Sequence, residues 1–334
     1  MSERGVGADP GVLVISLDFE LHWGVRDWAG PMSPYRANLL GARAIIPRLL
    51  DVFSKYQIAA TWATVGFLFA GSRDELEAFS PIRRPLYVRE ELNPYQEPVG
   101  LDEHNDPLHF ARSLVTEIAA EPGQEIASHT FSHYLCLEDG QDEAAFRADI
   151  NAACRIAESR GIRLRSIVFP SNQLNSSYLP VLKEAGFIAY RGNQSGQFHK
   201  ASRKGEQGLA RRAMRAADCY VPLERAHLSC WDELVEPVGL CNVAASRFLR
   251  PYSPSIPLVE PLRLQRVVSS LEQAARSKRI FHLWWHPHNF GANSEENLAF
   301  LAKVLEAFTV LRDRYGMRSM TMAEVAGRAL ARAA

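Results

Sequence analysis

The stretch from Val12 to Gly24 (VLVISLDFELHWG) indicates the fold class, because an unbroken apolar run ends abruptly in polar side chains. The run over residues 12–17 is typical of a parallel strand that is covered on both faces. Residues 41–55 then place apolar side chains at helical spacing, and residues 58–63 predict a second strand. Strand, helix and strand in this order predict a right-handed βαβ unit.

The same alternation continues along the chain and predicts an α/β protein. Further strands are expected at 125–128, 166–169, 187–190, 280–285 and 318–320, and helices at 110–120, 142–160, 177–185, 263–277, 294–315 and 322–333. About seven parallel strands alternating with helices predict a distorted β/α barrel that forms one domain over residues 1–334. Two Pro-rich stretches near 72–107 and 192–260 break the rhythm, and we expect them to be long loop insertions that form walls or lids.

The composition excludes several classes of protein. Lys+Arg and Asp+Glu number 38 each, so no net charge draws the chain to nucleic acid, and no nucleic-acid partner is expected. The first apolar run is far shorter than the ~20 residues that span a bilayer, so no stable membrane insertion is expected. The five cysteines form no Cys-x-x-Cys pair, and the first ten residues lack the apolar core of a signal peptide. We therefore expect a cytoplasmic protein.

Polar clusters follow three of the predicted strands. They are Asp18 with Glu20, His129 with His133, and His286 with His288. In β/α barrels the carboxyl ends of the strands meet at the active site. Two imidazoles and a carboxylate are a usual ligand set for a catalytic divalent ion that keeps one position open for water.

Each cluster also has a purely structural alternative. His129 and His133 are spaced i, i+4, so one helical turn would put both imidazoles on one side, but capping or core histidines give the same pattern. Asp18 and Glu20 point the same way if the extended geometry persists, so one could bind metal while the other takes a proton from water. Alternatively, Asp18 caps a turn and Glu20 is solvated.

These motifs resemble those of the polysaccharide deacetylase family, the NodB-homology proteins of carbohydrate esterase family 4. Residues 16–20 (SLDFE) resemble the first motif in its Asp-x-Asp/Glu form, found in intracellular and exopolysaccharide-linked members. The stretch His129-Thr-Phe-Ser-His133 matches the His-Ser/Thr-x-x-His motif, and residues 281–288 (FHLWWHPH) resemble the late motif. The resemblance runs from about residue 12 to 325 and implies a distorted β/α barrel.

The resemblance also implies roles for single residues. Asp18 would be the general base and His286 the general acid, with His288 as the alternative acid. Glu20, His129 and His133 would hold one divalent transition metal, with zinc as the expected ion. Leu283 or a nearby Trp would pack against the acyl methyl, and Asn172 and His288 are further candidates for contact with the substrate. Apart from the resemblance, Trp23 could stack on a sugar ring, but most tryptophans in barrels belong to the core.

Two positions depart from the family pattern. The ligand that is usually Asp is the longer Glu20, and the third motif, residues 169–172 (FPSN), keeps its proline but lacks the arginine that orders the base. Asn172 could do part of that work. Residues 230–232 (CWD) are the nearest candidate for the fourth motif, or they are loop packing.

Two weaker features lie in the insertions. His104, Asp106 and His109 could form a second metal site, or a polar turn ahead of a helix. The basic residues of segment 199–215 could meet the phosphates of a nucleotide- or lipid-linked sugar, or form a solvated helix face. That segment contains His199, Lys200, Arg203, Lys204, Arg211, Arg212 and Arg215.

The sequence therefore predicts a metal-dependent hydrolase that removes an N-acyl group, with N-acetyl expected, from an amino sugar. The amino sugar could be linked to a nucleotide or a lipid. The expected context is the biosynthesis of surface polysaccharide or O-antigen. Two alternatives stay open. The first is a deformylase or another hydrolase of non-peptide C–N bonds on the same fold, and the second is a catalytically degenerate sugar-binding protein.

Overall fold

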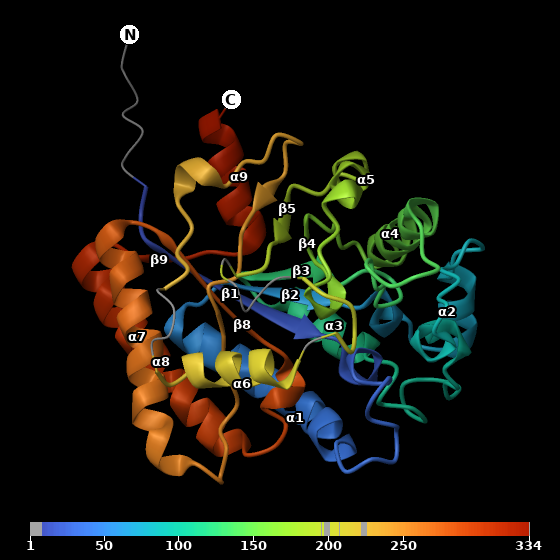
Figure 1. Ribbon diagram of the computed structural model, residues 1–334, viewed down its shortest axis with the longest axis horizontal. Coiled ribbons are helices and arrows are strands. Elements are labelled where there is room, and N and C mark those ends of the chain that lie inside the picture. The colour runs from blue at the N-terminus through green and yellow to red at the C-terminus, as the bar shows by residue number, and fades with distance from the viewer. Residues whose placement is uncertain (1–8, 195, 197–200, 207, 222–225, 334) are drawn as a thin grey trace.

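A twisted sheet of parallel strands forms the centre of the molecule (Figure 1). The computed structural model describes residues 9–333, except 195, 197–200, 207 and 222–225. The strands are β1 (Val12–Phe19), β2 (Ala60–Thr64), β3 (Gln124–Ser128), β4 (Ser166–Val168), β5 (Ala189–Arg191), β6 (Cys241–Asn242), β7 (Arg247–Phe248), β8 (Ile280–Trp285) and β9 (Arg318–Ser319).

The strands follow the order β6-β5-β4-β3-β2-β1-β8-β7, and β9 pairs with the start of β1. All the pairings are parallel. Only residues 243–246 separate β6 and β7, the two ends of this order, so the chain itself nearly closes the sheet. The predicted distorted β/α barrel is confirmed, with two short strands, β6 and β7, inside the stretch that was predicted to be an insertion.

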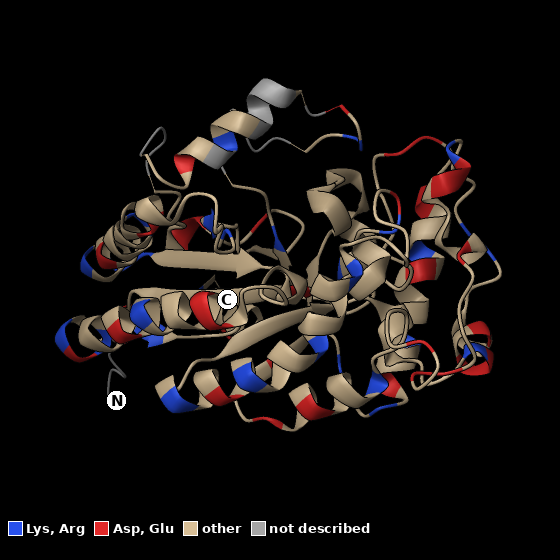
Figure 2. Cartoon of the chain, turned by 90° about the horizontal axis from the view of Figure 1, so that it is seen from below, with Lys and Arg blue, Asp and Glu red and all other residues tan. Residues whose placement is uncertain are grey.

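Helices connect the strands and cover the sheet. They are α1 (Arg36–Tyr56), α2 (Arg73–Phe79), α3 (Arg112–Ala120), α4 (Glu143–Glu158), α5 (Leu179–Glu184), α6 (Leu209–Asp218), α7 (Glu260–Ser277), α8 (Ser294–Tyr315) and α9 (Met322–Ala333). Figure 2 shows Lys, Arg, Asp and Glu mainly on helices and loops, whereas the strands are largely tan. No helix in the described part of the chain is long and apolar enough to span a membrane.

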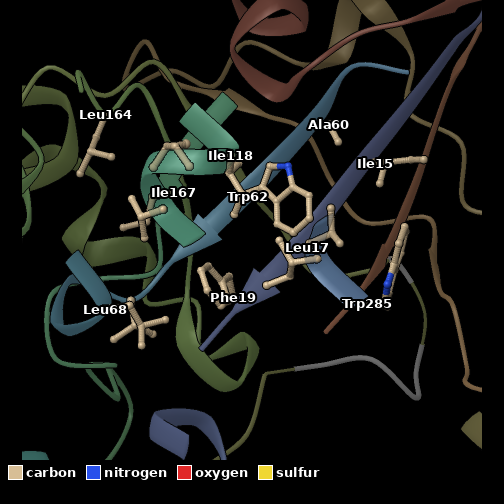
Figure 3. Packing of buried hydrophobic residues seen from close by; sticks show 14 of the residues in the cluster. Ile15, Leu17, Phe19, Ala60, Trp62, Leu68, Ile118, Leu164, Ile167 and Trp285 are labelled. Carbon is tan, nitrogen blue, oxygen red and sulfur yellow. The ribbon is translucent and has the colours of Figure 1, made fainter. Parts of the chain in front are cut away.

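The alternation of side chains along β1 divides the core into two parts. Leu13, Ile15, Leu17 and Phe19 face the larger cluster, which Trp62 and Trp285 join (Figure 3). The opposite face of β1 is apolar only at its start, where Val12 and Val14 belong to a second cluster that side chains of α9 complete. Towards the carboxyl end this second face becomes polar, and the site forms there.

Candidate active site

Three strands deliver the predicted polar residues to one edge of the sheet. Asp18 is near the end of β1 and Glu20 follows it, His129 follows β3, and His286 follows β8. Because β1 pairs in parallel with β8 on one side and with β2 on the other, and β2 pairs in parallel with β3, these carboxyl ends lie together. The structure therefore gathers Asp18, Glu20, His129, His133 and His286 as expected from the sequence.

Glu20, His129 and His133 converge on one point. The Nε2 atoms of His129 and His133 lie 3.2 and 3.1 Å from Oε2 of Glu20, and all three side chains are buried. One potential ligand atom from each residue lies within 4.8 Å of the other two. The space is kept open by Gly24, where an added Cβ would lie 2.0 Å from Oε1 of Glu20.

The protonation states of this group suit a divalent cation. Nδ1 of His129 is 2.9 Å from the carbonyl of Val168, to which it donates as N–H, and this bond turns its Nε2 atom toward Glu20. Burial lowers the pKa of His133 to about 4, which keeps that imidazole neutral at pH 7. Burial by itself would raise the pKa of Glu20, but His286, His129 and His133 hold it well below its usual range. An ionised carboxylate beside neutral imidazole fits a divalent ion of the zinc class.

The segment that carries the two histidines is an irregular loop, and the predicted helical turn is wrong. Thr130 and His133 have positive φ angles of 61° and 58°, which helical residues do not adopt. Asp149 of α4 holds the loop, because its carboxylate accepts hydrogen bonds from the backbone N–H groups of Phe131 (2.7 Å) and Ser132 (3.2 Å) and from the Ser132 hydroxyl. The two imidazoles therefore meet through loop geometry that Asp149 supports.

Arg191, which the sequence motifs did not reveal, binds Asp18 through both carboxylate oxygens. The Nη1–Oδ1 and Nη2–Oδ2 distances are both 2.7 Å, and the pair is buried. Burial raises the pKa of Asp18, but Arg191, together with His129 and His286, more than offsets this and holds the pKa below its usual value. The guanidinium carbon also lies 4.2 Å from the centre of the Trp284 ring.

This pair corrects the interpretation of the third motif. The arginine absent from residues 169–172 is replaced by Arg191 at the end of β5, one strand further along the sheet. Asn172 accepts a hydrogen bond from Arg191 Nη2 at 3.2 Å, so it contacts the arginine in addition to any role toward substrate. The strand predicted from the sequence ended at residue 190. Inspecting the residue directly after that strand, as was done for the other strands, would have identified Arg191.

His286 and His288 occupy different environments. Nε2 of His286 lies 3.4 Å from Oε1 of Glu20 and 3.8 Å from Oδ2 of Asp18, and its side chain is 23% exposed. The His288 ring is buried and stacks on His286, with 4.9 Å between the ring centres. Burial lowers the pKa of His288 to about 3. His286 is therefore the imidazole that reacting groups can reach.

Two residues predicted to contact substrate are placed elsewhere. Leu283 is fully buried in the larger core cluster, because side chains on a strand alternate and Leu283 points away from Asp18. Its neighbour Trp284 points to the opposite face of β8, is partly exposed and lies beside His286, with 5.6 Å between the ring centres. Trp23 is also buried and donates its indole N–H to the carbonyl of His109 (3.0 Å), which leaves no ring face for a sugar.

Residues 230–232 lie at the opposite end of the sheet. Trp231 donates its indole N–H to the carbonyl of Pro10 (3.0 Å), just ahead of β1, and Asp232 pairs with Arg332 of α9 (2.5 Å). Ser229 pairs with Ile280, the first residue of β8. This segment is therefore packing, and it supplies no fourth motif to the site.

The basic segment of the second insertion is only partly described. Arg203 pairs with Asp139 and Lys204 with Asp27, each at 2.6 Å, so both cations already have carboxylate partners. Arg215 lies on α6 and is partly buried. His199, Lys200 and the side chains of Arg211 and Arg212 lie outside the described residues.

Comparison with known proteins supports the interpretation of the motifs. A family model described as polysaccharide deacetylase matches residues 40–190, which include His129, His133 and Asn172. Asp18, Glu20 and His286 lie outside that match. No curated protein matches the chain.

Solved structures share the fold at low sequence identity. A proposed polysaccharide deacetylase from Mycobacterium smegmatis has 15% identity and a TM-score of 0.57, over 100% of this chain and 95% of that one. Another, from Pseudomonas aeruginosa PAO1, has 13% identity and a TM-score of 0.52, over 97% and 92%. The Puue allantoinase has 12% identity and a TM-score of 0.52, over 96% and 92%. Over residues 40–190 the chain is thus similar to the polysaccharide deacetylase family, and it shares the fold of these solved structures.

Proposed function

We propose that this protein removes an N-acyl group from an amino sugar by hydrolysis, with the help of one divalent transition metal. The expected acyl group is N-acetyl, and the expected ion is zinc. The observation that carries the proposal is the convergence of Glu20, His129 and His133 beside Asp18 and His286 at one edge of the sheet. When bound to the first three residues, the ion would polarise the acyl oxygen and lower the pKa of a water molecule.

The protein's own groups then account for the proton transfers. Asp18, which its low pKa keeps ionised, accepts a proton from the attacking water. Arg191 occupies one lone pair of each Asp18 oxygen and thereby orients the carboxylate. His286 reaches the same space from β8 and donates a proton to the leaving amine. Trp284 offers its partly exposed ring beside His286 as the wall for the acyl methyl.

The biological setting belongs to the same proposal. The five cysteines are all unpaired, which agrees with a reducing compartment and with action in the cytoplasm on a nucleotide- or lipid-linked amino sugar. Such a substrate is an intermediate in the assembly of surface polysaccharide or O-antigen.

The first test measures metal content and acetate release. Wild type is expected to bind zinc or cobalt through the Glu20 site and to release acetate from an N-acetylhexosamine nucleotide or a short N-acetylated oligosaccharide. His133→Ala should lose that ion, and Asp18→Asn should keep it but lose about 10²- to 10⁴-fold in rate. His104→Gln is the matched control, because that histidine is exposed.

The outcomes separate the alternatives. Acetate release that survives both chelation and Asp18→Asn would contradict the proposal. Glycan binding without metal-dependent turnover would favour a degenerate sugar-binding protein. Turnover of N-formyl sugars or cyclic amides in place of N-acetyl sugars would favour another C–N hydrolase, and a cyclic amide belongs in the panel because the allantoinase shares this fold.

A further inference from the structure

We propose that His22, Glu97 and His109 form a second site for a divalent transition metal of the zinc class, separate from the Glu20 site. Nε2 of His22 lies 3.2 Å and Nε2 of His109 3.8 Å from Oε1 of Glu97. One potential ligand atom from each residue lies within 4.8 Å of the other two. The inference does not rest on the proposed function, since none of these residues takes part in the deacylation.

The orientation of His109 is the strongest indication of a ligand. Nδ1 of His109 is 2.7 Å from Oδ2 of Asp106, to which it donates as N–H, so the Nε2 atom points toward His22 and Glu97. That Nε2 atom is buried and has no hydrogen-bond partner among the described residues, since 3.8 Å to Glu97 exceeds hydrogen-bond range. A carboxylate that orients a histidine in this way commonly stands behind a metal ligand.

Asp106 is itself fixed by the backbone. Its Oδ2 atom accepts a hydrogen bond from the N–H of Gly100 at 2.8 Å, and its Oδ1 atom from the N–H of Leu108 at 3.3 Å. The orienting carboxylate therefore stays in place whether or not an ion is bound. His104, which the sequence pattern grouped with Asp106 and His109, is exposed and takes no part.

The donor set and its burial fit the zinc class. Two imidazole nitrogens and one carboxylate oxygen are the ligands of an open zinc site, with a remaining position for water. The side chains of His22 and His109 are 0% and 3% exposed, whereas that of Glu97 is 16% exposed. Solvent thus has access to the site on the side of Glu97.

The location indicates a structural role. His22 belongs to the 3₁₀ turn Leu21–Gly24, directly after Glu20, and Glu97 follows the turn Pro94–Gln96 of the first insertion. His109 precedes α3. An ion here would tie the insertion and the start of α3 to the segment that presents Glu20 to the active site.

The competing explanation is a proton in place of the ion. A protonated His109 held between Asp106 and Glu97 would also satisfy these charges, and it predicts that no second metal binds. Metal stoichiometry of the full-length protein decides between the two explanations.

The experiment first removes metal from the protein with a chelator and then adds Zn²⁺. The bound metal per chain is measured by plasma mass spectrometry after gel filtration, and the absorption of the Co²⁺-loaded protein is a second readout. Wild type should bind two equivalents. His109→Gln and Glu97→Gln should each bind one, and His133→Gln should also bind one. The double variant His109→Gln/His133→Gln should bind none, and His104→Gln should keep two. Asp106→Asn should weaken the second equivalent 10- to 100-fold, because the orienting carboxylate is lost.

A wild type that binds one equivalent, which both His109→Gln and Glu97→Gln retain, would overturn the second site. Two equivalents that survive both substitutions would also overturn it. Glu97 is partly exposed, so Glu97→Gln keeps the test valid if His109→Gln does not fold. If instead wild type binds one equivalent that His109→Gln loses and His133→Gln keeps, the second site stands while the metal site of the proposed function fails.

Discussion

At the residue scale, the buried pair of Arg191 and Asp18 links stability to catalysis. Removing the guanidinium in Arg191→Gln leaves a buried carboxylate without its partner, which typically costs about 3–5 kcal/mol. In wild type the pair lowers the pKa of Asp18. Its contribution to the free energy of unfolding is therefore fully present above the unfolded-state pKa near 3.8, and it is lost as the pH falls through the lower pKa of the folded state.

In the Arg191→Gln variant, only His129 and His286 still oppose the effect of burial, so we expect the pKa of Asp18 to rise above its unfolded value. The loss of stability should then be largest at pH 7 and shrink as the pH is lowered toward 4, because Asp18 becomes protonated. Urea unfolding of chelated wild type and variant at several pH values measures this. A penalty that does not change with pH would contradict the electrostatic account.

The two histidines of the late motif should differ in their effect on the reaction. His286 faces Asp18 and Glu20 and is partly exposed, so His286→Gln should lower kcat by about 10²- to 10⁴-fold. His288 is buried behind it, so His288→Gln should act only through the position of the His286 ring and cost less. Steady-state rates of acetate release, with metal content checked for both variants, decide the assignment. A greater loss for His288→Gln would reverse it.

At the scale of single elements, α4 shapes the metal-binding loop through Asp149. In Asp149→Asn an amide NH₂ replaces one acceptor oxygen and faces a backbone N–H, so we expect a loss of about 1–3 kcal/mol and weaker metal binding. The matched control is Asp142→Asn. The Asp142 carboxylate accepts a hydrogen bond from the N–H of Ala145 (2.7 Å) at the start of the same helix. The asparagine still caps the helix, so this variant should keep full metal affinity. Calorimetric metal titration and urea unfolding compare the two variants, and equal metal affinities would argue against a role for Asp149 in the site.

At the scale of the whole molecule, α9 completes the inner core of the sheet. Met322, Val325, Ala326 and Ala329 pack against Val12 and Val14 of β1 and against β4, β5 and β6, below the polar end of the same face. The C-terminal helix therefore supports the strands whose other ends carry Asp18 and Arg191.

Met322→Ala should destabilise the protein by about 2–5 kcal/mol, because it leaves a cavity in this core. Gly327 is exposed on the same helix and has no neighbour near an added Cβ, so Gly327→Ala should instead stabilise by about 1 kcal/mol. The free energies of unfolding of both variants, measured by chemical denaturation, test these two predictions. A Met322→Ala variant as stable as wild type would show that α9 is not required for the core.

The class of fold and most of the active-site edge could be predicted from the amino-acid sequence. Long runs such as residues 12–17 and 280–285 have a local signal strong enough to identify strands, and polar residues after them mark the carboxyl ends. Asp18, Glu20, His129, His133 and His286 could therefore be grouped from the sequence pattern. The short strands β6 and β7 carry no such signal, since two residues show no periodicity.

How these groups are held, and which residues partner them, depends on the tertiary structure. The pairing of Asp18 with Arg191 joins residues on β1 and β5, and the group formed by His22, Glu97 and His109 joins a strand end, an insertion and a helix start. Periodicity describes neighbours along one element, whereas these contacts depend on strand order and loop paths, which the sequence pattern does not encode. The face of β8 that meets the site, with Trp284 in place of Leu283, likewise followed from the register between β8 and β1.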